Sequence, residues 1–121
     1  MTSADNWKQQ LKPMEGQRWP IRCSMTLTVQ DVARLREGLW PRDMDDRWAV
    51  HLDEEVLRAW RSWTGICVYE GQVMLADDGS ATVGVLDVLD EPESYHRAST
   101  EAGELERFEG VVSLAISRQV A

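Results

Sequence analysis

The amino-acid sequence predicts an α+β domain with a mainly antiparallel sheet of about five strands. A short helix is expected after the first strand, and a C-terminal amphipathic helix is expected to pack on one face of the sheet. Two observations support this fold class. Short strand-like segments follow one another with tight turns, and near the C-terminus the apolar spacing changes to three and four residues. With 121 residues the chain fits a single globular domain, 1–121, in which residues 1–15 are expected to be an irregular N-terminal segment.

The first strand and the helix after it are nearly contiguous. Residues 21–29 (IRCSMTLTV) alternate and are rich in β-branched side chains, which predicts a strand. Thr28 is a candidate N-cap with Asp31 three residues later, and Gly38 is placed to end the helix. The residues available to the buried side of this helix are Val29, Val32, Ala33 and Leu35.

Four further strands are expected after a loop that contains Pro41 and three aspartates. Their short connections favour an antiparallel meander. In the first of them, Trp48, Val50 and Leu52 alternate onto one face. The four segments are residues 47–53, 56–63, 66–76 and 81–89.

The C-terminal helix is expected to run from residue 100 to about residue 118, after an irregular segment over residues 90–99. Glu101 and Glu104 in its first turn suit the positive end of the helix dipole. The apolar positions that recur at three and four are Leu105, Phe108, Val111, Val112, Ala115 and Ile116.

The net charge of −8 is concentrated in the second half of the chain. Residues 1–63 hold ten acidic and ten basic side chains, whereas residues 64–121 hold eleven acidic and three basic ones. An acidic surface repels phosphate backbones, which argues against direct nucleic-acid binding. It favours a protein partner with a basic surface, because complementary charge speeds encounter. The alternative is that the charge only keeps the protein soluble.

The composition favours a cytoplasmic protein. The N-terminus has no apolar run of the kind that a signal peptide needs, and no window approaches the roughly 18 apolar residues of a membrane span. Cys23 and Cys67 lie far apart without a CxxC pattern, so they are expected to be free, buried thiols. No metal-ligand spacing, phosphate-binding loop or nucleophile elbow occurs. No cofactor, metal site or enzyme class is therefore predicted.

The densest cluster of large side chains is the stretch RAWRSWTG, residues 58–65. Alternation along the strand places Leu57, Ala59, Arg61 and Trp63 on one face. If the apolar members face the core, Arg61 is drawn inward with them, and a buried guanidinium needs a carboxylate or several carbonyls. An internal ion pair that fixes the strand register is favoured, and the alternative is that Arg61 receives an anionic group of a ligand. The candidate internal partners are Asp45, Asp46 and Asp87.

Other candidate binding residues are expected near this arginine. Tyr95 and His96, in the irregular segment before the last helix, are placed to line the mouth of a pocket. No residue is assigned a catalytic role. The full set of candidates for binding a ligand or a partner is Arg61, Trp60, Trp63, Ser62, Tyr95, His96, Asp45 and Asp46.

The hairpin region carries the sequences DDRW at residues 45–48, RSWTG at 61–65 and ICVYE at 66–70, followed by EPESY at 91–95. This order resembles a family of small bacterial domains with the pattern "[DE]DKW … RSWTG … Y". The resemblance spans residues 39–116, and RSWTG is its most specific part. Arg47 stands where the family usually has Lys, and residues 58–60 (RAW) stand where it more often has an aromatic residue and His. The resemblance implies the architecture and the importance of the RSWTG motif, and it implies no reaction.

Two functions are expected from these observations. The first is a non-catalytic, acidic interaction protein that binds a protein partner, of an immunity or antitoxin type. The second is a small-molecule-binding domain that holds an anionic or nucleotide-like ligand at an Arg/Trp cluster by charge and stacking.

Overall fold

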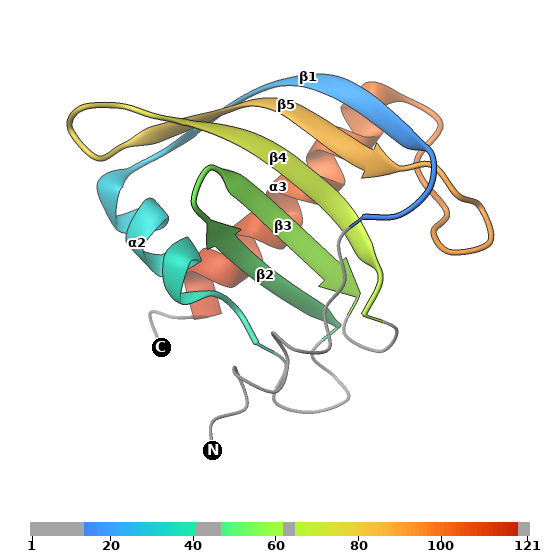
Figure 1. Cartoon of the computed structure of the whole chain (residues 1–121), viewed down its shortest axis with the longest axis horizontal. Coiled ribbons are helices and arrows are strands. Elements are labelled where there is room, and N and C mark those ends of the chain that lie inside the picture. The colour runs from blue at the N-terminus through green and yellow to red at the C-terminus, as the bar shows by residue number, and fades with distance from the viewer. Residues whose placement is uncertain (1–13, 41–46, 62–64, 119–121) are drawn as a thin grey trace.

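The computed structural model describes residues 14–40, 47–61 and 65–118 of the chain. These residues form one five-stranded sheet and two helices, in the order shown in Figure 1. The elements are β1 (Arg18–Leu27), α2 (Val29–Glu37), β2 (Trp48–Asp53), β3 (Val56–Arg61), β4 (Cys67–Leu75), β5 (Ala81–Leu89) and α3 (Glu101–Arg118). The predicted α+β class, the helix after the first strand and the C-terminal helix are confirmed.

The sheet is antiparallel throughout, with the strand order β1-β5-β4-β3-β2. Strands β2 to β5 form the predicted meander, and β1 pairs with β5 at the far edge. Pro20 lies in β1, where the missing N–H is tolerated because an edge strand has a neighbour on one side only. Strand β4 is therefore the central strand, with β3 paired on one side and β5 on the other.

Helix α2 begins with the predicted cap. The Thr28 hydroxyl accepts a 3.1 Å hydrogen bond from the Asp31 N–H, and the Asp31 carboxylate accepts one of 3.0 Å from the Thr28 N–H. Two of the N–H groups that a helix start leaves unpaired are satisfied in this way. Val32 and Leu35 are buried as predicted. The prediction is wrong for Val29 and Ala33, which are exposed because they lie on the side of this short helix that faces away from the core.

Helix α3 packs across one face of the sheet and crosses behind the strands in the view of Figure 1. Phe108, Val112 and Ala115 are almost completely buried, which confirms the predicted apolar stripe. Phe108 lies edge-on to Tyr69 of β4, with the ring centroids 5.3 Å apart. Contact between helix and sheet is close here because β4 carries Gly71, whose added Cβ would lie 3.6 Å from Phe108 Cζ. This packing joins the C-terminal helix to the central strand.

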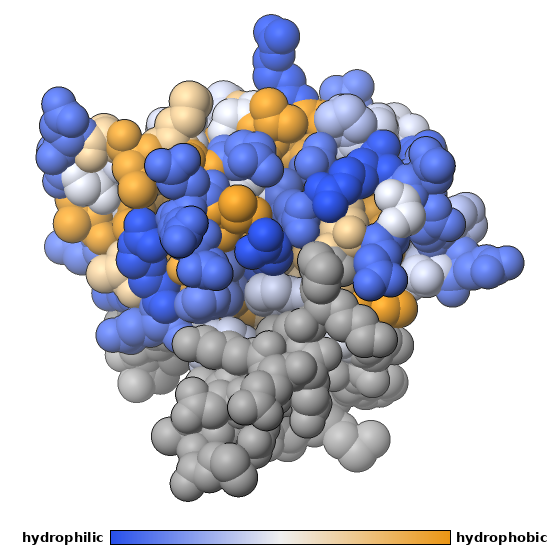
Figure 2. Space-filling model, viewed as in Figure 1, coloured by the Kyte–Doolittle hydropathy of each residue, from blue (hydrophilic) through white to orange (hydrophobic). Residues whose placement is uncertain are grey.

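The opposite side of the sheet carries a buried carboxylate. Glu70 on β4 accepts hydrogen bonds from Arg18 (2.6 Å), from Arg58 (3.1 Å) and from the Met14 N–H (3.3 Å). Burial alone would raise the pKa of Glu70, but the hydrogen bonds from Arg18 and Arg58 outweigh burial and hold it below its ordinary value. The face seen in Figure 2 is mostly hydrophilic, with a group of apolar residues toward the left of the view.

Both cysteines, Cys23 and Cys67, are free and buried, as predicted. Burial, and then the nearby charge of Glu70, raises the pKa of the Cys67 thiol to about 12. Neither helix that the structure describes combines the length and apolar character needed to cross a membrane.

Candidate functional site

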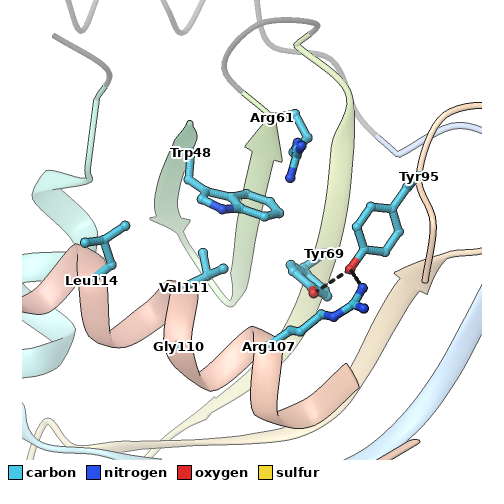
Figure 3. A pocket seen from close by; sticks show the side chains of 8 residues that line it. All are labelled: Trp48, Arg61, Tyr69, Tyr95, Arg107, Gly110, Val111 and Leu114. Carbon is cyan, nitrogen blue, oxygen red and sulfur yellow. Dashed lines mark hydrogen bonds between the residues drawn. The ribbon is translucent and has the colours of Figure 1, made fainter. Parts of the chain in front are cut away.

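A pocket of about 390 Å³ opens between α3 and the adjoining ends of β2 and β3. Figure 3 shows Trp48 and Arg61 on its strand side, Arg107 and Gly110 on its helix side, and Tyr95 at one end. The lining residues are Trp48, Arg61, Tyr69, Tyr95, Arg107, Gly110, Val111 and Leu114. Five different segments of the chain thus contribute, and this volume suits a small organic molecule.

Arg61 lies on the predicted face of the sheet but is not buried. In the register of the hairpin it is the last residue of β3, opposite Trp48, and its side chain is exposed. Its guanidinium lies 5.2 Å from the centre of the Trp48 ring, a cation–π arrangement. It forms no ion pair with any residue that the structure describes. The prediction of a buried Arg61 is therefore wrong, because the sheet ends here and α3 does not close over it.

The prediction of Asp87 as a carboxylate partner of Arg61 is also wrong. Asp87 pairs instead with Arg18, at 3.2 Å. Asp45 and Asp46 lie outside the described residues. Arg58, rather than Arg61, forms the partly buried ion pair of this strand, with Glu70 as its partner. The arginine–carboxylate pair of β3 thus differs from the predicted one, since it uses Arg58, three residues earlier and on the opposite face, and its partner Glu70 lies on β4.

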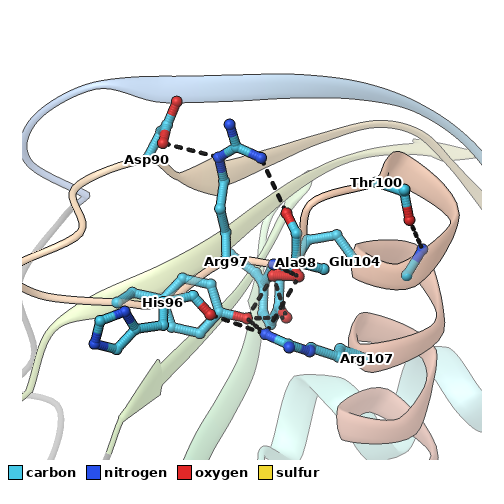
Figure 4. Close-up of polar contacts among 10 residues, drawn as sticks. Asp90, His96, Arg97, Ala98, Thr100, Glu104 and Arg107 are labelled. Atoms are coloured by element: carbon cyan, nitrogen blue, oxygen red, sulfur yellow. Dashed lines mark hydrogen bonds and ion pairs between the residues drawn. The ribbon is translucent and has the colours of Figure 1, made fainter.

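Tyr95 is buried at the end of the pocket and belongs to a polar network centred on Glu104 (Figure 4). The Glu104 side chain is completely buried in α3, and its Oε1 accepts hydrogen bonds from the hydroxyls of Tyr69 (3.1 Å) and Tyr95. Its Oε2 accepts one from the Ala98 N–H at 3.2 Å. Four groups, including the Arg107 guanidinium at 3.7 Å, surround this carboxyl group, which is how a buried polar group is retained in a core.

The two phenols of this network are held in their neutral form. Burial, followed by the neighbouring Tyr95 and Glu104, raises the pKa of Tyr69 far above its ordinary value. Burial, followed by the hydrogen bond to Glu104, also raises the pKa of Tyr95. In both cases a phenolate would stand next to a carboxyl group in the protein interior. The hydroxyls therefore act as hydrogen-bond donors that fix the position of Glu104.

Arg107 is anchored through one nitrogen. Its Nη1 donates hydrogen bonds to the Tyr95 hydroxyl (3.2 Å) and to the His96 carbonyl (2.9 Å), and the same nitrogen is the one nearest Glu104. The Nε and Nη2 groups make no hydrogen bond within the described ranges 14–40, 47–61 and 65–118. Since an arginine has five N–H donors, three of them remain for a ligand, on a side chain that is 50% exposed. The network thus fixes the orientation of Arg107 and leaves three of its N–H donors unused.

The structure brings two of the predicted site residues, Arg61 and Tyr95, to one pocket. Trp60 is buried next to Arg61 in sequence, but successive residues of a strand point to opposite faces, and Trp60 does not line this pocket. His96 is exposed, and only its backbone carbonyl takes part in the network. Ser62 and Trp63 lie outside the described residues.

Sequence reasoning missed Trp48, Glu104 and Arg107 as site residues. Alternation predicts Trp48 on one face with Val50 and Leu52, and it lies on that face but is only half-buried. Glu104 was assigned to the helix dipole, although it stands four residues before Phe108 and hence on the apolar stripe. A carboxyl group on such a stripe is the signal that points to a buried network.

No group of three His, Cys, Asp or Glu side chains within the described part of the chain is arranged to hold a metal ion. Comparisons of the chain with models of known protein families, with curated proteins and with solved structures found no match.

Proposed function

We propose that this protein binds a small organic anion in the pocket between α3 and the β2–β3 hairpin. The observation that supports the proposal is the pair of arginines on that pocket. Arg61 and Arg107 both line it, and both keep N–H donors that no described residue uses. In a chain with a net charge of −8, two such cations on one concave surface provide a local reason for an anion to bind.

The rest of the lining suits a ligand with an apolar part. Trp48, Val111 and Leu114 supply carbon surface on the side of the pocket away from Tyr95 (Figure 3). Trp48 is further held flat against Tyr69, with the ring centroids 5.8 Å apart and an angle of 24° between the planes. A pocket with apolar walls and a few oriented polar groups is typical of small-molecule sites. The arginines would then fix the anionic end and the aromatic wall the body.

The test is calorimetric titration of the protein with benzoate, acetate and inorganic phosphate, with Arg61→Ala and Arg107→Ala as variants. We expect at least one of the anions to bind and each variant to weaken binding by about 10-fold or more, because removing a charge-assisted hydrogen bond costs ~1.5–3 kcal/mol. The matched control is Arg22→Ala, which removes an exposed arginine of β1 that does not line the pocket. Equal affinities of the wild type and both pocket variants would contradict the proposal.

A second candidate function is binding of a protein partner that carries a basic surface, in the cytoplasm. It is supported by the eleven acidic against three basic residues of 64–121, among them the exposed Asp77 and Asp78 between β4 and β5. A pull-down from lysate at low and high salt tests it. Retention of one partner at low salt that is released by salt favours it. If substitution of Arg61 abolishes this retention, the partner binds at the pocket instead.

A further inference from the structure

We propose that the ligand class of this pocket is a planar monocarboxylate, and that Gly110 determines this specificity by keeping the floor of the pocket open. This inference rests on the proposed anion-binding function and goes beyond it by naming the shape and the charge of the ligand. Three observations carry it: the surroundings of Gly110, the indole of Trp48 on the other side of the pocket, and the unused N–H donors of Arg107.

Gly110 has no packing or conformational reason to be glycine. It lies in the middle of α3, where glycine is less favourable than alanine by about 1 kcal/mol. Its φ is not positive. A Cβ added at Gly110 would meet no atom within 4 Å, whereas one at Gly103 of the same helix would lie 3.1 Å from Thr100 Oγ1. Since Gly110 lines the pocket, a larger side chain would extend into the space where a ligand would lie.

The part of the pocket next to Gly110 is bounded by the backbone of α3 and by the Trp48 ring. In Figure 3 the helix backbone at Gly110 and the Trp48 indole lie on opposite sides of the pocket. Because Tyr69 and Arg61 already pack on the indole, a ligand would contact only the part of this half-buried ring that they leave exposed, and the bare backbone opposite favours a flat ligand there. Val111 and Leu114 border the same space with apolar atoms.

The arginines of the pocket suit a carboxylate. Arg61 and Arg107 are the two positively charged residues that line the pocket, and the guanidinium of Arg107 keeps three N–H donors that no described residue uses. The free Nε and Nη2 edge of Arg107 is also the planar fork that binds a carboxylate through two parallel hydrogen bonds.

The experiment compares benzoate, acetate and inorganic phosphate on the wild type, on Gly110→Leu and on Ser113→Leu by calorimetric titration. Ser113 is an exposed residue of α3 that does not line the pocket, so it controls for the added leucine. We expect benzoate to bind the wild type about 10-fold more tightly than acetate or phosphate. Gly110→Leu should lose benzoate binding by about 10-fold or more, while Ser113→Leu stays within about 2-fold of the wild type. Circular dichroism checks that each variant is folded, and Gly110→Ala, expected to weaken benzoate binding less than leucine does, replaces Gly110→Leu if the larger residue prevents folding.

The outcomes separate this inference from the function on which it rests. Phosphate binding as tightly as benzoate, or benzoate binding that Gly110→Leu leaves unchanged, overturns the planar-carboxylate class. If that binding still depends on Arg61 and Arg107, the anion-binding function stands. Failure of all three anions to bind the wild type overturns both.

Discussion

The Tyr69 hydroxyl, on the central strand β4, donates a 3.1 Å hydrogen bond to Glu104 Oε1 of helix α3, 35 residues later in the chain. Both side chains are completely buried. The bond lies directly behind the pocket, because Tyr69 lines it and Tyr95 and Arg107 join the same carboxyl group. One buried glutamate therefore connects the packing of helix on sheet to the orientation of an arginine that lines the pocket.

Replacing this glutamate should cost much of the stability of the domain. In Glu104→Ala the hydroxyls of Tyr69 and Tyr95 and the Ala98 N–H lose their acceptor, and a cavity remains in the core. We expect the free energy of unfolding to fall by about 2–5 kcal/mol in urea denaturation. Glu101→Ala, an exposed residue in the same first turn, should change it by less than about 1 kcal/mol. Similar losses for the two variants would contradict the buried network.

The two tyrosines should make the fold sensitive to alkali. Their pKa values are raised in the folded state, by burial first and then by the neighbouring phenol or carboxyl group. A raised pKa stabilises the fold fully below the unfolded value of about 10, and this contribution declines as the pH rises above it. Tyr69 and Tyr95 are the only tyrosines of the chain, so tyrosinate absorbance reports on them alone. Their ionisation should coincide with loss of the far-UV circular dichroism signal, and ionisation of both in a fully folded sample would be the contrary result.

Acid should act through the other face of the sheet. The pKa of Glu70 is lowered in the fold, because the hydrogen bonds from Arg18 and Arg58 outweigh the effect of burial. Its contribution to stability is present above the unfolded value of about 4.3 and is lost as the pH falls through the lower, folded value. Glu70→Gln removes the titrating group, so its stability should fall less steeply with acid below pH ~4 than that of the wild type. Parallel stability curves for the two proteins would rule out Glu70 as a source of the acid response.

Alternation and helical period were sufficient for most of the fold. Among the described residues they identify the five strands, helices α2 and α3 and the Thr28 cap, because each of these depends on residues close in sequence. Alternation also assigned Arg61 to the face of Leu57 and Ala59 correctly. It could not show that Arg61 is exposed, since that depends on where α3 stops covering the sheet.

Local sequence patterns could not predict the polar network, because its members come from separate segments of the chain. Glu104 stands on the apolar stripe of α3, yet its acceptors are used by Tyr69 and Tyr95, which are 35 and 9 residues away. Only the fold brings the three together. The pocket, too, combines β2, β3, β4, the segment before α3 and α3 itself, so no continuous motif marks it.

Of Gly71 on β4 and Gly84 on β5, Gly71 is the less tolerant of an added side chain. A Cβ there would lie 2.9 Å from Val83 Cγ1 and in contact with Phe108. We expect Gly71→Ala to lower the free energy of unfolding by about 1–3 kcal/mol, since Val83 and Phe108 are both fully buried and cannot move aside. At Gly84 the nearest atom is the terminal methyl group of the exposed Met74, at 3.1 Å, so Gly84→Ala should cost less in the same denaturation experiment. An equal cost at both glycines would contradict the close packing of α3 on β4.

The thiols give a test of burial that does not depend on mutation. Cys67 is buried beside Glu70, with its Sγ 4.0 Å from Oε2, and burial and that charge raise its pKa to about 12. Because the thiolate is the reactive form, Cys67 should react with a thiol reagent at pH ~8 only through unfolding. Cys23 is buried as well, so the folded protein should show almost no fast labelling, whereas denatured protein should show both thiols. Rapid labelling of Cys67 in folded protein, located by mass spectrometry, would contradict the burial of this thiol. Retention of slow labelling in Glu70→Gln would assign the protection to burial rather than to charge.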